Sequence, residues 1–241
     1  MSIVNTQIAY ILHKRAYRET SSILEVLTRD FGRVSLMARG SRGARSKLAG
    51  NLLLFTPLLI SWQGKGDLPY LKAAERADLK TPVLKSKSLF SAMYINELLM
   101  YLLHRNDVNE EVFEIYHHCL YALESNSDIE ISLREFEIKL LETLGFGLNL
   151  STEADTGQPL ALEKRYHYFV EHGAVATGKA VAQNVPLVSG ECLLALSNKQ
   201  YSLLSENALF LAELKQLMRY VINHHLGYKK LKSREMFKPL G

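Results

Sequence analysis

Hydrophobic and polar positions alternate along roughly the first 80 residues with the period of β-strands. Short runs rich in β-branched and aromatic residues, separated by turn residues, predict five strands, over 3–11, 22–28, 33–39, 52–62 and 68–78. Gly32 closes a hairpin turn, and Pro57 interrupts the fourth run. Five short strands with one long loop predict a small Greek-key barrel of the oligonucleotide-binding (OB) type, although an SH3-like barrel would give a similar pattern.

The pattern changes to a helical period after the last of these strands. Residues 89–104 are apolar on nearly every side, which predicts a buried helix. Asn109, followed by two glutamates, predicts the start of a second helix. Ser132 and Glu135 have the S-x-x-E spacing of a capping box, so we expect a third helix from Ser132 to Gly145.

The rest of the chain predicts two more helices after an irregular region. Residues 150–183 are polar and irregular, with a hairpin expected around His172 and Gly173. Ser189 predicts the cap of a short helix, and a longer helix opens at Ser205 or Asn207.

These elements define an α+β fold in two parts. The first is a five-stranded OB barrel over 1–80, a candidate nucleic-acid-binding domain. The second is an α-helical domain over 81–241 that contains a small irregular or hairpin region at 150–185.

Charge is distributed very unevenly along the chain. The net charge of +4 combines a basic start, an acidic middle and a basic end. Residues 1–87 hold 15 Lys and Arg against 6 Asp and Glu, residues 88–213 hold 7 against 18, and residues 214–241 hold 7 against 1. This asymmetry indicates nucleic-acid contact at one or both ends of the chain.

The most basic stretch runs from 32 to 50. Arg39, Arg42, Arg45 and Lys47 are separated by glycines and small residues, and no acidic residue lies between positions 30 and 67. Charges of one sign cannot be buried together without losing their hydration. The stretch is therefore either a solvated loop or a surface for an anion such as a phosphate backbone. Strand alternation also places Arg33 on the same face as Arg39.

Arg134 occupies an unusual position in the predicted third helix. A helix that starts at Ser132 places Arg134 in its first turn, where a cation opposes the helix dipole at a cost of a few tenths of a kcal/mol. Two interpretations remain open at this point: a solvated arginine that tolerates the penalty, or a residue that serves an anionic ligand at the helix start.

Most catalytic patterns are missing from the sequence. The stretch from Gly173 to Ala180 nearly matches a phosphate-binding loop, but Ala180 replaces the hydroxyl residue that would hold magnesium. Cys119 and Cys192 are predicted to be small core residues, and such unpaired core cysteines indicate a reducing compartment. The histidines lack zinc-ligand spacing. No metal or cofactor is expected. Without a leader or a long apolar run, we expect a cytoplasmic protein.

Several stretches resemble the RecO family of bacterial recombination mediators. They are YILHKRAYRETSSILEVLTRDFGRVSLMARGSRGARSK, LFTPLLISWQGKGDLPYLKAAE, YINELL, LREFEIKLLETLGFGLNL and LKSREMF, in the order and spacing of that family. The segment LSTEADTGQPL lacks the CxxC pairs that many members carry there, so the resemblance is to the proteobacterial type without zinc.

The resemblance implies a protein without enzymatic turnover that acts in DNA repair. It implies binding of single- and double-stranded DNA, annealing of complementary strands, and help in loading recombinase onto strands coated by single-strand-binding protein. The implied partners are RecR and the acidic C-terminal tail of single-strand-binding protein, and the implied location is the cytoplasm, at the nucleoid during repair.

Two sets of site residues follow from the basic segments and the resemblance. Arg134, with Leu133 and Leu141 beside it, is the expected site for the aromatic, carboxylate-ending tail. The expected DNA-binding residues are Arg33, Arg39, Arg42, Arg45, Lys47, Lys65, Lys229, Lys230, Lys232 and Arg234. The alternatives are a scaffold whose barrel binds an acidic protein partner and, less favoured because of Ala180, a nucleotide-dependent enzyme.

Overall fold

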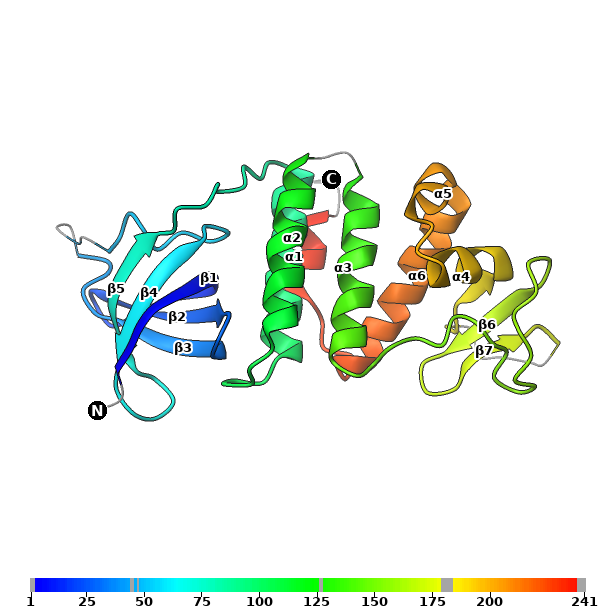
Figure 1. The fold of residues 1–241 in the computed structure, drawn as a ribbon, viewed down its shortest axis with the longest axis horizontal. Helices are drawn as coiled ribbons and strands as arrows, with labels where there is room; N and C mark the ends of the chain where they lie inside the picture. Colours follow the sequence, from blue (N-terminus) through cyan, green and yellow to red (C-terminus); the bar gives the residue numbers. More distant parts are fainter. Residues whose placement is uncertain (1–2, 44–45, 47, 126–127, 179–183, 238–241) are drawn as a thin grey trace. The chain divides into compact units, whose positions relative to one another are not determined.

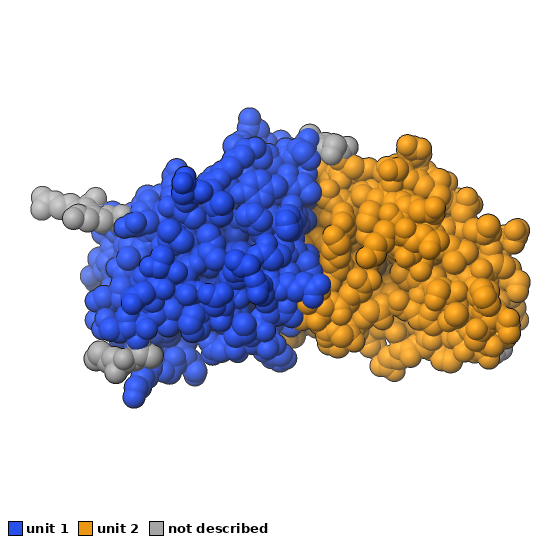
Figure 2. Space-filling model, viewed as in Figure 1, with its two compact units in different colours: residues 1–126, 231–241 blue, residues 127–230 orange. Residues whose placement is uncertain are grey.

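The computed structural model describes residues 3–43, 46, 48–125, 128–178 and 184–237. The chain divides into two compact units (Figure 2). Unit 1 comprises residues 1–126 and 231–241, and unit 2 comprises residues 127–230. Two helices therefore group with the barrel in unit 1. The predicted domain division after residue 80 remains a prediction.

The five N-terminal strands of unit 1 form a closed barrel (Figure 1). They are β1 (Ile3–Tyr17), β2 (Ser21–Thr28), β3 (Gly32–Ala38), β4 (Leu58–Gln63) and β5 (Tyr70–Arg76). The order around the barrel is β1-β2-β3-β5-β4, with β1 and β4 closing it and β3 beside β5 in parallel. This is the Greek-key arrangement of an OB fold, so the predicted α+β class with an OB barrel is confirmed.

The strands differ from prediction mainly in their bounds. β1 continues to Tyr17, because a register shift after Ile11 lets its second half stay paired with β2. The fourth run becomes a strand only from Leu58, after Pro57. The barrel core includes Val34, Leu36 and Ala38 of β3, as alternation predicts, and Trp62 of β4, which is 6% exposed.

Two helices and a short C-terminal turn complete unit 1. They are α1 (Lys87–Leu102), α2 (Glu110–Ser125) and the 3₁₀ helix η1 (Lys232–Phe237), which lies against α1. Asn109 accepts a hydrogen bond from the N–H of Val112, 3.1 Å away, which confirms the predicted cap of α2. Asn96 of α1 donates to the carbonyl of Leu12 at 2.8 Å and accepts from Tyr116 of α2 at 2.7 Å. One buried amide therefore ties the barrel to both helices.

Unit 2 combines helices with a small sheet. Its elements are α3 (Ile129–Thr143), β6 (Arg165–Phe169), β7 (Gly173–Ala176), β8 (Leu187–Ser189), α4 (Gly190–Ser197), α5 (Tyr201–Glu206) and α6 (Ala208–His225). The strands pair in the order β7-β6-β8, and the hairpin predicted at His172 and Gly173 joins β6 to β7. Ser189 and Asn207 cap α4 and α6 with their side chains, as predicted.

The start predicted for α3 is wrong. The helix begins at Ile129, and its cap is Asp128, whose side chain accepts from the N–H of Ile131 at 3.2 Å. Ser132 instead donates its hydroxyl to the Asp128 carbonyl one turn back, and Glu135 pairs with Lys139. Asp128 is as good a cap residue as Ser132, and the earlier start buries Ile131 and Leu133 in the apolar face.

Candidate nucleic-acid interface

An arginine and a tyrosine meet on the outside of the barrel where β3 runs beside β5. Met37 pairs with Tyr70 in parallel, and the N–H of Met37 donates to the Pro69 carbonyl at 2.8 Å. Arg39 follows at the end of β3, and its guanidinium lies 3.8 Å from the centre of the Tyr70 ring. Both residues are exposed. A cation over an exposed ring offers phosphate attraction and a stacking face at one place.

The basic loop after β3 is attached to the turn between β1 and β2. The Arg42 N–H donates to the Thr20 carbonyl at 2.8 Å, and its guanidinium donates to the Arg18 carbonyl at 3.2 Å. Arg18 itself lies over the ring of Tyr17, 5.3 Å from its centre. We call Tyr17, Arg18, Arg39, Arg42 and Tyr70 the basic edge of the barrel.

Arg18, Tyr17 and Tyr70 were not among the site residues predicted from the sequence. Their signal is weak, because a single arginine in a hairpin turn is usually a solvated residue. The informative feature is position: the start of β2, directly after this turn, pairs with the end of the neighbouring strand β3, with Ser22 opposite Ala38. Only the strand register brings that turn beside the basic loop.

Arg33 does not face outward with Arg39. Its side chain is 12% exposed, and it donates to the Met100 carbonyl of α1 at 2.8 Å. It also lies 3.8 Å from Glu25, a buried carboxylate that accepts hydrogen bonds from Ser35 and Arg105 at 2.7 Å each. Burial lowers the pKa of Arg33, and Glu25 opposes that change. The last turn of α1 lies beside Arg33, so Arg33 is not among the proposed DNA contacts.

The other predicted DNA-binding residues are spread over separate places. Lys65 is exposed in the loop between β4 and β5. Lys229 and Lys230 are exposed after α6 in unit 2, whereas Lys232 is exposed and Arg234 half-buried in unit 1. Arg234 lies 5.8 Å from the ring centre of Tyr94 on α1. Arg45 and Lys47 lie outside the described residues.

The predicted tail-binding residues lie on α3. Because the helix starts at Ile129, Arg134 belongs to its second turn, and the argument from a cation in the first turn does not apply. The Arg134 side chain is 12% exposed, and its guanidinium lies 2.9 Å from the carboxylate of Glu137, whose side chain is fully buried. Leu133 and Leu141 are 6% and 1% exposed, so both are core residues of unit 2.

The described residues contain no cluster of three or more His, Cys, Asp or Glu side chains suited to a metal ion. Neither Cys119 nor Cys192 forms a disulfide, both are buried, and burial raises the pKa of the Cys192 thiol to about 12. The near-match to a phosphate-binding loop begins with Gly173, which starts strand β7 of the small sheet. No helix within the described ranges is long and apolar enough to cross a membrane.

The barrel, its basic edge and the attached helices define the class: an OB-fold protein with a cationic, aromatic surface. Comparison with known families identifies the member of that class. Residues 1–79 match the family model "Recombination protein O N terminal", and residues 86–235 match "Recombination protein O C terminal".

Curated relatives can be aligned with this sequence over most of its length. DNA repair protein RecO of Methylococcus capsulatus is 41% identical over 95% of this chain and 91% of its own length. The Coxiella burnetii protein of that name is 41% identical over 95% of each chain, and the Yersinia pestis protein is 39% identical over 96% of this chain and 93% of its own. The chain belongs to the RecO family of DNA repair and recombination proteins.

Proposed function

We propose that this protein is a recombination mediator that binds single- and double-stranded DNA through the basic edge of its barrel. It anneals complementary strands and helps load recombinase onto strands coated by single-strand-binding protein. The observation that carries the proposal is the Arg39 guanidinium over the exposed Tyr70 ring, with Arg18 and Arg42 attached beside it.

The chemistry of this edge suits DNA of any sequence. Arginines neutralise phosphates and release counterions, which depends on charge and not on the bases. Exposed tyrosine rings can stack on bases, because each base has an aromatic face. A surface of this kind can hold flexible strands while they find complementary partners. We propose that it does so without enzymatic turnover, in the cytoplasm and at the nucleoid during repair.

The proposed protein partners are RecR and the acidic tail of single-strand-binding protein. Family membership supports both, and Arg134 remains the proposed contact for the tail carboxylate. The burial of Leu133 and Leu141 argues against these two leucines as the surface that receives the tail's aromatic ring.

An annealing assay tests the proposed function. The full chain should accelerate pairing of two complementary oligonucleotides, and Arg39→Gln with Arg42→Gln should slow it several-fold. The matched control, Arg29→Gln with Lys80→Gln, removes the same charge from exposed residues that pair with Glu110 and Glu124. Arg29 follows β2 at the end opposite the basic edge. Equal activity of both variants and wild type would refute the assignment of the basic edge.

The tail contact needs a variant that changes both members of the buried Arg134–Glu137 pair. Arg134→Ala alone would break this pair beside a buried carboxylate and destabilise unit 2 by about 3 kcal/mol or more. We therefore expect Arg134→Met combined with Glu137→Gln to fold, to keep DNA binding, and to lose binding of an acidic tail peptide. Retention of peptide binding would exclude Arg134 as its contact.

A further inference from the structure

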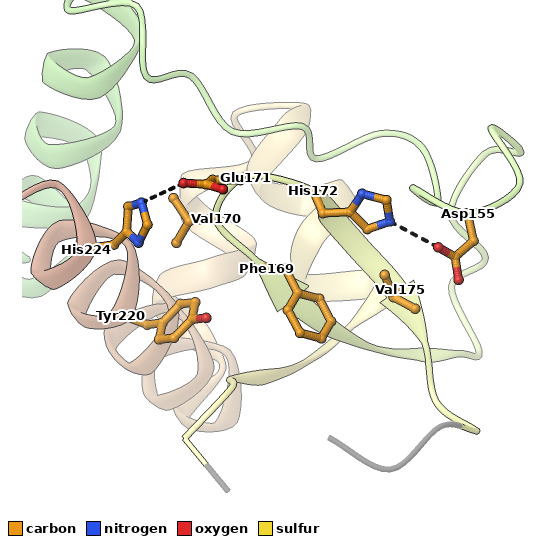
Figure 3. Close-up of a pocket in the computed structure, with 8 residues that line it drawn as sticks. All are labelled: Asp155, Phe169, Val170, Glu171, His172, Val175, Tyr220 and His224. Carbon is orange, nitrogen blue, oxygen red and sulfur yellow. Dashed lines mark hydrogen bonds and ion pairs between the residues drawn. The ribbon is translucent and has the colours of Figure 1, made fainter. Parts of the chain in front are cut away.

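A cavity of about 500 Å³ in unit 2 has a composition opposite to that of the basic edge. It lies between the hairpin of β6 and β7 and helix α6, and its lining includes the rings of Phe169 and Tyr220 (Figure 3). Two carboxylates, Asp155 and Glu171, face it together with His172 and His224. We call this site the acidic aromatic pocket. It contains no lysine or arginine among its described lining residues.

Each carboxylate of the pocket is paired with an imidazole. His172 Nε2 lies 3.0 Å from Asp155 Oδ1, and His224 Nε2 lies 3.4 Å from a carboxylate oxygen of Glu171. In Figure 3 the ring of Phe169 lies between the two pairs. Because a carboxylate only accepts hydrogen bonds, His172 donates from Nε2 to Asp155, and in the neutral form its Nδ1 remains an acceptor.

The polar groups of the pocket therefore mainly accept hydrogen bonds and carry negative charge. Their side chains are reachable: Glu171 is 85% exposed and Asp155 is 34% exposed. A phosphate would meet two carboxylates, so the pocket disfavours DNA. A metal ion is not indicated either, since no suitable cluster of ligands occurs among the described residues. The fitting ligand is a donor-rich cation that can also lie against aromatic rings.

A guanidinium group has these properties. It is planar, always charged, carries five N–H donors and no acceptor, and is weakly hydrated enough to stack on aromatic faces. Lysine offers a compact, strongly hydrated charge that uses the rings less well. We propose that the acidic aromatic pocket binds an arginine side chain on a basic segment of a partner protein. The inference concerns a protein contact of unit 2 and does not depend on DNA binding by the barrel.

Methyl NMR of the full chain, labelled at valine, leucine and isoleucine, tests this directly. Val170 and Val175 line the pocket and serve as reporters. The probe is the capped peptide Gly-Arg-Gly, compared with Gly-citrulline-Gly, which has nearly the same shape without the charge. We expect the arginine peptide to shift the Val170 and Val175 methyls in a saturable way, and the citrulline peptide to leave them unchanged.

Matched variants separate the pocket from general electrostatic attraction. Asp155→Asn with Glu171→Gln should lower the affinity for the arginine peptide about tenfold or more, because the double substitution removes two charge-assisted hydrogen bonds. Glu163→Gln with Glu191→Gln removes the same charge from exposed residues elsewhere in unit 2 and should change affinity less than about twofold. Equal weakening by both variants, equal shifts from citrulline, or the same shifts from a single-stranded oligonucleotide would each overturn the proposal.

Discussion

The carboxylate of Glu97 on α1 holds the backbone and the hydroxyl of Ser233, 136 positions further along the chain. Its oxygen Oε2 accepts from the Ser233 N–H at 2.9 Å and from the Ser233 hydroxyl at 2.5 Å, while Oε1 accepts from the Lys232 N–H at 3.0 Å. A carboxylate thus satisfies the free amides at the start of η1. Two segments that resemble the RecO family, YINELL and LKSREMF, therefore contact each other within unit 1.

Removal of this carboxylate should release the C-terminal segment. Glu97→Ala is expected to lower the free energy of unfolding by about 2 kcal/mol, because three charge-assisted hydrogen bonds to the start of η1 are lost. Ser233→Ala, which removes only the hydroxyl contact, should cost about 1 kcal/mol. Hydrogen exchange of the amides of residues 231–237 checks the cause: unchanged protection in Glu97→Ala would contradict the proposed anchoring.

Asn96 should be among the most sensitive polar positions of unit 1. Asn96→Ala leaves the Leu12 carbonyl and the Tyr116 hydroxyl without their partner, at an expected cost of about 2–4 kcal/mol. Tyr116→Phe keeps the amide contact to Leu12 and should cost only about 1–2 kcal/mol. Urea unfolding of the two variants provides the comparison. The interpretation fails if Tyr116→Phe is the more damaging change.

Two glycines with the same backbone conformation should differ sharply in their tolerance of alanine. Gly32 has a φ of 63° and Gly40 a φ of 62°. A Cβ on Gly32 would lie 1.9 Å from the Asp107 carbonyl oxygen, whereas a Cβ on Gly40 would meet nothing within 4 Å. We expect Gly40→Ala to cost about 1–2 kcal/mol from the left-handed backbone alone. Gly32→Ala should cost about 3 kcal/mol or more. Equal melting temperatures would disprove the close approach.

The stability of unit 1 should depend on pH through His117. Its Nδ1 lies 2.6 Å from the Tyr10 hydroxyl, and burial lowers the pKa of His117, with Glu114 opposing the change. The unfolded imidazole has a pKa of about 6.5. Its contribution to stability is therefore complete above that value and is lost as pH falls through the lower folded pKa.

Urea unfolding at pH 7.5 and pH 5.5 measures this contribution. Wild type should lose more free energy of unfolding between these pH values than His117→Gln, because glutamine accepts from Tyr10 without titrating. Burial also lowers the pKa of His225, but that contribution is common to both proteins and cancels in the comparison. If both proteins lost the same free energy of unfolding between these pH values, His117 would not contribute to the pH dependence.

Sequence periodicity predicted the barrel well because each strand has one face in the core. Val34, Leu36 and Ala38 alternate with other side chains, and they line the barrel as expected. Periodicity could not show that the last turn of helix α1 lies beside Arg33. Arg33 was therefore assigned to a DNA-binding face, although it donates to Met100 inside unit 1. The residue type alone does not reveal which neighbour accepts the hydrogen bonds of an arginine.

The polar residues of helix α1 illustrate the same limit. Asn96 and Glu97 lie in a helix that is apolar nearly all round, and their partners are 20 to 136 positions away. The helix start at Asp128 was missed for a local reason, since Ser132 offered an equally plausible cap. Local signals identify elements and caps. The register of the barrel and long-range hydrogen bonds decide which residues form a site.

The salt dependence of binding to single-stranded DNA tests the central claim most directly. Each phosphate neutralised by an arginine contributes about 0.7 to the slope of log affinity against log salt concentration for single strands. We predict that Arg39→Gln with Arg42→Gln lowers the magnitude of the wild-type slope by roughly 1.4, while Arg29→Gln with Lys80→Gln leaves it nearly unchanged. Slopes that are the same for wild type and both variants, or that change equally in both variants, would contradict DNA binding at the basic edge.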